Sequence, residues 1–91
     1  MSRGRYLQIT FNFSGPTKVK ELEVAFNQGL DWIRIAPNAW LVWTTSDPEK
    51  WFGRLKPKIN NDDHMYIFEI DIDARKGWAP KSVWDWIKKT R

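Results

Sequence analysis

Three carboxylates near the end of the chain stand at a spacing that could ligate a metal ion. Glu69, Asp71 and Asp73 lie at every second position, so a strand would place them on one face. They span about 13 Å along a strand, which is too far for one ion without ligands from elsewhere. The pattern is more typical of a solvated edge, or of ion pairs with Arg34, Arg75 or a second subunit. We therefore expect no metal ion and no other cofactor.

The remaining residue types that carry chemistry are scarce. His64 is the only histidine, and the chain has no cysteine. A metal site with two histidines, a Ser/His hydrolytic triad, a thiolate site and a disulfide are therefore all disfavoured or excluded. The stretch FSGP contains one glycine and lacks the pattern of a phosphate-binding loop. The sequence predicts no catalytic residue of these kinds.

Asn12 is the last residue on the polar face of the first predicted strand, over residues 6–13, in which Leu7, Ile9 and Phe11 alternate with polar side chains. A Ser-Gly-Pro break begins two residues later, and sites often begin where strands end. Two interpretations stay open from the residues alone: Asn12 is the remnant of a catalytic position, or it is a polar residue that bonds the loop.

The elements that must position these residues can be predicted from hydrophobic periodicity. A helix over 14–29, capped by Ser14 or Thr17, follows the first strand, and a hairpin over 31–45 turns at Pro37-Asn38. A second helix over 46–59 begins with a capping box of Ser46 and Glu49, with Pro48 in its first turn. A strand over 64–73 and a short C-terminal helix from Pro80 complete the order.

This order predicts an α+β fold, namely a ferredoxin-like βαββαβ sandwich with a short C-terminal helix, as a single domain over residues 1–91. Both larger helices are expected on one face of the sheet. The side expected to face them consists of Leu7, Ile9, Phe11, Leu41, Trp43, Phe68 and Ile70. The opposite side is expected to carry Gln8, Thr10, Asn12, Trp40, Val42, Thr44, Glu69 and Asp71.

A sheet face that carries Tyr6, Trp40 and Val42 is too apolar to be left in water. We therefore expect a homodimer built on the face opposite the helices, with the terminal segment taking part. The predicted interface residues are Tyr6, Gln8, Thr10, Trp40, Val42, Trp78, Trp84 and Trp86.

The charge balance allows a nucleic-acid ligand without requiring one. The formal net charge is +4 and the isoelectric point is about 9.6. The candidate residues for contacts with RNA or DNA are Arg54, Lys56, Lys58, Lys88 and Lys89. A solvated basic surface is an equally good interpretation. The lack of cysteine, of a long apolar run and of a signal-like start predicts a cytoplasmic protein without a membrane partner.

Three stretches, YLQITFNF, NAWLVWTT and GWAPKSVWDWIKK, together with the element order, resemble the small proteins of the SinR family. These are relatives of VapD and of the small dimeric CRISPR adaptation subunit. The resemblance covers nearly the whole chain, and its most specific part is the tail. It implies a ferredoxin-like fold and a homodimer, and its nuclease members are metal-dependent endoribonucleases.

In those nuclease members the first strand ends in hydrophobic-x-Tyr-Asp, and the aspartate is proposed to hold a divalent metal at the dimer axis. The matching stretch here is Ile9-Thr10-Phe11-Asn12. An amide supplies no charge to offset the dehydration of Mg²⁺, so the resemblance implies that Asn12 marks a degenerate active-site position.

Three interpretations of function follow. The leading one is a non-catalytic homodimeric binding module, with nucleic acid as a candidate ligand of its basic rim. The first alternative is a metal-dependent endoribonuclease that uses Asp71, Glu69 or another carboxylate in place of the missing aspartate. The second alternative is a small inhibitor protein that binds a defence or toxin component.

Overall fold

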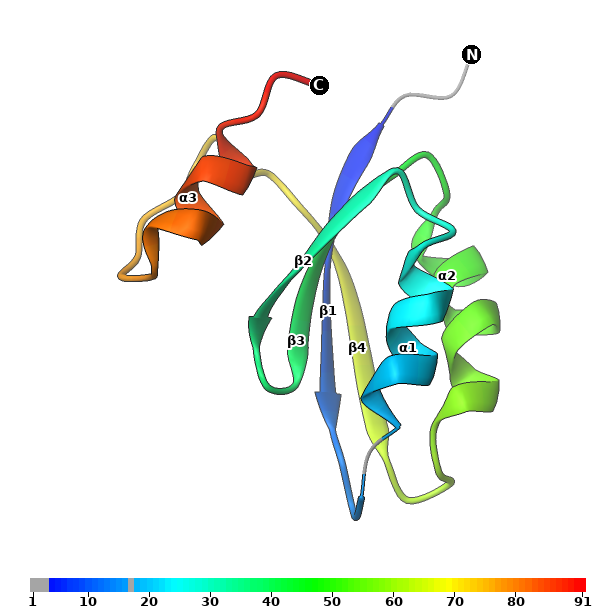
Figure 1. The fold of residues 1–91 in the computed structure, drawn as a ribbon. Helices are drawn as coiled ribbons and strands as arrows, with labels where there is room; N and C mark the ends of the chain where they lie inside the picture. The colour runs from blue at the N-terminus through cyan, green and yellow to red at the C-terminus, as the bar shows by residue number, and fades with distance from the viewer. Residues whose placement is uncertain (1–3, 17) are drawn as a thin grey trace.

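The computed structural model describes residues 4–16 and 18–91. It has an α+β fold in which four antiparallel strands form one sheet of order β2-β3-β1-β4. The elements follow the predicted order: β1 (Arg5–Asn12), α1 (Val19–Phe26), β2 (Asp31–Ala36), β3 (Ala39–Thr44), α2 (Pro48–Leu55), a 3₁₀ turn (Lys56–Lys58), β4 (His64–Ile70) and α3 (Lys81–Ile87). Helices α1 and α2 lie on one face of the sheet and α3 on the other (Figure 1). Across the described ranges, no helix has the length and apolar character needed to cross a membrane.

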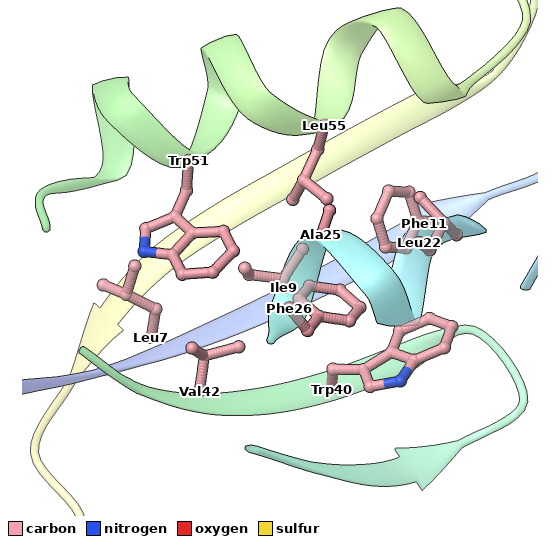
Figure 2. Close-up of a cluster of buried hydrophobic side chains, with 10 residues drawn as sticks. All are labelled: Leu7, Ile9, Phe11, Leu22, Ala25, Phe26, Trp40, Val42, Trp51 and Leu55. Atoms are coloured by element: carbon pink, nitrogen blue, oxygen red, sulfur yellow. The ribbon is translucent and has the colours of Figure 1, made fainter. Parts of the chain in front are cut away.

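The main core lies between the sheet and the two larger helices. Figure 2 shows its ten buried side chains, which are Leu7, Ile9, Phe11, Leu22, Ala25, Phe26, Trp40, Val42, Trp51 and Leu55. The indole N–H of Trp51 donates to Thr44 Oγ1 at 3.1 Å within this core. The indole N–H of Trp51 and the hydroxyl of Thr44 are therefore both hydrogen-bonded. The core can thus bury the large apolar surface of Trp51 without leaving its donor unpaired.

The prediction placed the side chains of β3 on the wrong faces of the sheet. Trp40 and Val42 face α1 and α2 and are fully buried, opposite Ile9 and Leu7 in the register with β1. Leu41 lies on the other face with α3. Apolar residues occupy both the odd and the even positions of β3, so alternation does not indicate which side chains face α1 and α2. An error of one residue in the register then places every side chain on the wrong face.

The same reversal applies to β4. Met65 and Ile67 pack against the main core, whereas Tyr66 and Phe68 lie on the opposite side of the strand and are exposed. The prediction had turned Phe68 towards the helices because an alternating run of aromatic and β-branched residues normally marks the buried side. The strand ends at Ile70, three residues earlier than expected.

The start of α2 is fixed by Asp47 and not by the predicted capping box. Asp47 Oδ1 accepts a hydrogen bond from the backbone N–H of Lys50 at 2.9 Å, and Pro48 occupies the first turn. The backbone N–H of Ser46 instead donates to Thr44 Oγ1 at 3.0 Å. The location of the helix start was predicted correctly, but the capping residue was not.

Ser14 joins two loops instead of capping α1. Its backbone N–H and its hydroxyl both donate to Asp63 Oδ1, at 2.7 and 2.8 Å, while Asp63 Oδ2 accepts from the N–H of Asn60. The backbone hydrogen bonds from Ser14 and Asn60 lower the pKa of Asp63. Lys18 occupies the N-cap position of α1, and the alternative cap, Thr17, lies outside the described residues.

A second core forms where α3 docks on its own sheet. Val83, Trp86 and Ile87 of α3 and Leu41 of β3 are buried together, and Tyr6, Ile33, Ile35, Trp43, Ile70, Ile72, Ala79 and Trp84 pack around them. Helix α3 covers this face of the sheet near the end where β1 begins, and the other end carries no helix (Figure 1). The terminal helix therefore finds cover within one copy of the chain.

Candidate interaction surface

The part of the sheet that α3 leaves uncovered is the main candidate site. We call it the open face, and it consists of Gln8, Thr10, Asn12, Tyr66 and Phe68. The register pairs Gln8 with Phe68 and Thr10 with Tyr66, so these side chains are cross-strand neighbours. Tyr66 is 51% exposed and Phe68 is 61% exposed. Two neighbouring, largely exposed aromatic side chains beside polar side chains are typical of an interaction surface.

Two of the predicted interface residues, Gln8 and Thr10, lie on the open face and are partly exposed. Tyr6 lies on the same side of the sheet, but Trp43 and Trp86 cover it, with ring centroids 4.7 and 5.8 Å from its own. Trp40 and Val42 belong to the main core, so this fold does not present them to a partner. Sequence reasoning did not identify Tyr66 and Phe68 as surface residues. The available signal was the apolar pair Met65 and Ile67, which alternates with them along β4 and packs against the main core.

The three tail tryptophans have different environments. Trp86 is buried in the second core, Trp84 is partly buried, and the side chain of Trp78 is fully exposed. Trp78 and Trp84 line a cavity of about 630 Å³ between α3, the segment that precedes it and the sheet, which also includes Gln8 and Arg75. Of the three, Trp78 alone remains wholly available for contact with a partner.

The end of the tail is held by Arg91. Its guanidinium donates to Asp31 Oδ2 at 2.9 Å, to the Tyr6 hydroxyl at 3.2 Å and to the carbonyl of Trp86 at 3.4 Å. It also stacks over the rings of Trp86, Trp43 and Tyr6 at 4.7, 5.8 and 6.0 Å. We call this group of residues the Arg91 clamp, and it joins the end of the tail to β1, β2 and β3.

The Arg91 clamp changes the ionisation of Asp31. Burial opposes the charged carboxylate, but the hydrogen bonds from Arg91 and from the N–H of Trp32, with the charges of Lys89 and Arg91, outweigh burial. The net effect lowers the pKa of Asp31. Lys89 Nζ lies 3.5 Å from the same carboxylate but is far more exposed than Arg91.

Asn12 is exposed at the end of β1, opposite His64 in the register with β4. The predicted carboxylate stripe does not form, because β4 ends before Asp71 and Asp73. Glu69 is paired with Arg5 at 3.0 Å, and Asp71 Oδ1 accepts the N–H of Asp73. Among residues 4–16 and 18–91, no three histidine, cysteine or acidic side chains form a group suited to a metal ion.

The predicted nucleic-acid contacts fall into two separate groups. Arg54 stacks over Trp51 at 4.8 Å, and Lys56 and Lys58 lie in the 3₁₀ turn that follows α2. Lys88 and Lys89 follow α3, on the other side of the sheet and at the opposite end of the molecule (Figure 1). The structure therefore does not bring the five cations into one groove. Trp51 is fully buried and cannot stack on a base.

Comparison of the chain with protein-family models, with curated proteins and with solved structures gives no match. The likeness of its three sequence stretches to the SinR family therefore stays a prediction.

Proposed function

We propose that this protein is a non-catalytic binding module with a ferredoxin-like fold, and that it acts as a homodimer. The ferredoxin-like assignment is supported by the order of elements, by the sheet order β2-β3-β1-β4 and by the position of α1 and α2 on one face. The homodimer is also what the resemblance to the VapD and CRISPR adaptation-subunit family implies.

The observation that carries the proposal is the exposure of Tyr66 and Phe68 on the open face. An aromatic side chain offers about 150–250 Å² for burial, so each of these leaves roughly 100 Å² uncovered. Two copies then contribute roughly 400 Å² of aromatic surface, about a quarter of a standard interface of ~1,600 Å². The polar side chains of Gln8, Thr10 and Asn12 supply donors and acceptors around it. A dimer of modest, concentration-dependent stability follows from these areas.

Support for the absence of catalysis comes from the side chains themselves. Asn12 offers a neutral amide where the nuclease relatives carry a metal-binding aspartate. The nearest alternatives proposed from the sequence, Glu69 and Asp71, are engaged by Arg5 and by the backbone. A metal-dependent hydrolysis needs a set of ligands that leaves a position open for water or substrate, and these residues do not supply one.

The proposal is tested by light scattering on the purified chain and on two single variants. Phe68→Arg places a charge on the open face, whereas the control variant Val24→Arg places the same charge on α1, at a side chain that is 67% exposed. At high concentration we expect the wild type and Val24→Arg to approach twice the 10.9 kDa mass of the chain. We expect Phe68→Arg to be monomeric. A wild-type monomer contradicts the homodimer, and a Phe68→Arg dimer contradicts the use of the open face.

A further inference from the structure

Strand β4 is an edge strand of the sheet. Its seven residues pair with β1 at every position, from Asn12↔His64 to Tyr6↔Ile70, without a register shift. No other strand of the described chain pairs with its outer side. The other edge strand, β2, has a register shift between Arg34 and Ala36. Proteins usually protect such an edge with a bulge, a proline or charged side chains; β4 has no bulge, proline or lysine, and its one acidic residue, Glu69, is paired with Arg5.

The two exposed aromatic side chains of β4 are arranged symmetrically about its central residue, Ile67. Tyr66 and Phe68 flank Ile67 and share the open face, while Ile67 points to the side of the main core. When two identical strands pair in antiparallel orientation about a two-fold axis, a residue that precedes the central position lies opposite the residue that follows it by the same number of positions. If the axis passes through Ile67, Tyr66 of each copy therefore lies opposite Phe68 of the other copy.

We propose that two copies pair along β4 in antiparallel orientation, with the two-fold axis at Ile67, and that their sheets become continuous. This rests on the proposed homodimer and names the segment that forms it. The backbone N–H and C=O groups on the outer side of β4, which no other described strand pairs, then find partners, and the four aromatic rings form one cross-strand cluster on the joined open face.

The charges of the strand fit a second copy. His64 and Glu69 are the basic and the acidic side chain of β4. In this register they lie opposite Ile70 and Met65 of the second copy, so no like charges face each other inside the paired strands. Just outside them Asp63 approaches Asp71, but three hydrogen bonds within its own loops hold the Asp63 carboxylate.

The competing arrangement is a face-to-face dimer, in which the two open faces pack against each other without backbone pairing. That arrangement also covers Tyr66 and Phe68, so loss of the dimer in a Phe68 variant does not separate the two. The distance between chosen positions on β4 does separate them.

The native chain has no cysteine, so single introduced cysteines report the register. In the proposed dimer, residue 65 of one copy faces residue 69 of the other, whereas residue 65 lies about 13 Å from its own equivalent. We expect an equimolar mixture of Met65→Cys and Glu69→Cys to form an oxidised heterodimer. Neither variant alone is expected to form a disulfide dimer at the same concentration. Both substitutions keep Tyr66 and Phe68 in place.

A second variant, Ile67→Cys, is expected to form a disulfide with its own copy because residue 67 lies at the axis. Circular dichroism and the light-scattering mass of each reduced variant verify folding and assembly. A dimeric protein in which the 65/69 mixture gives no more cross-linking than the single variants overturns the β4 pairing and leaves the proposed homodimer standing. A monomeric protein overturns both.

Discussion

Removal of the Arg91 side chain is expected to release α3 from the sheet while the main core stays folded. The Arg91 clamp joins the end of the tail to Asp31 and to three aromatic rings, and its side chain is only 14% exposed. The second core that α3 completes shares no buried residue with the main core. Opening of α3 can therefore occur as a local event with its own free energy.

The expected size of the effect follows from the contacts. A hydrogen bond to a charged group contributes about 1.5–3 kcal/mol when buried, and an exposed ion pair about 0–1 kcal/mol. Asp31 is 33% exposed, so we take about 1 kcal/mol for this pair. Stacking on the rings adds about 0.5–1 kcal/mol. Arg91→Ala should thus lower the free energy of α3 opening by about 2 kcal/mol, which is about 30-fold in the opening constant.

Hydrogen exchange measures this opening directly. The Lys88 N–H donates to the carbonyl of Trp84 at 3.0 Å and reports α3, and the Phe11 N–H donates to the carbonyl of Asn38 at 2.8 Å and reports the main sheet. In Arg91→Ala we expect about 30-fold faster exchange at Lys88 and little change at Phe11. The matched control is Lys89→Ala, whose ammonium contacts the same carboxylate but is 55% exposed. It should change the opening free energy by less than about 0.5 kcal/mol.

The pH dependence provides a second test of the same contact. The pKa of Asp31 is lower in the folded chain than its ordinary value of 3.8. The ion pair therefore contributes fully above pH 3.8 and is lost as the pH falls through the folded pKa. The difference between wild type and Arg91→Ala should shrink in that acidic range, and Asp31→Asn should remove the dependence. Equal exchange at Lys88 in wild type and Arg91→Ala at neutral pH refutes the clamp.

Three further predictions concern single side chains. Thr44→Val leaves the indole N–H of Trp51 unpaired in the core, and urea unfolding should show a loss of about 1–3 kcal/mol; an unchanged stability contradicts that hydrogen bond. By the same method, Asp47→Ala should lower the free energy of unfolding by about 1 kcal/mol and Ser46→Ala by less than about 0.5 kcal/mol. A larger loss for Ser46→Ala than for Asp47→Ala would favour Ser46 as the capping residue. Asn12→Asp should bind Mn²⁺ no more tightly than wild type in calorimetry, because the new carboxylate stands opposite a single histidine, His64, and the adjacent Asp63 carboxylate is already held by Ser14 and Asn60; micromolar binding contradicts this.

The sequence allowed prediction of the element order because periodicity and turn residues are local signals. Pro37-Asn38 marked the hairpin, and Pro48 marked the start of α2. The side assignment of β3 was not predictable in this way. Its residues are apolar at both parities because the strand is central and is covered by helices on both faces. The choice between the two faces then depends on the register with β1, which is a long-range property.

The candidate surface was predicted in location but only partly in composition. Gln8 and Thr10 were placed correctly because β1 alternates clearly between apolar and polar residues. Phe68, which is exposed in the structure, was assigned to the side facing the helices because large aromatic residues are usually buried. The sequence gives little warning that α3 covers only part of its face of the sheet, since that depends on where a short helix docks.

The mass of the unmodified chain in solution, measured by sedimentation velocity over a wide concentration range, tests the central claim most directly. We expect the mass to rise with concentration from the 10.9 kDa of one chain to twice that value. The rise follows from the modest apolar area that Tyr66 and Phe68 leave exposed. A mass of 10.9 kDa at every concentration, up to about millimolar, would contradict the homodimer on which the proposed function depends.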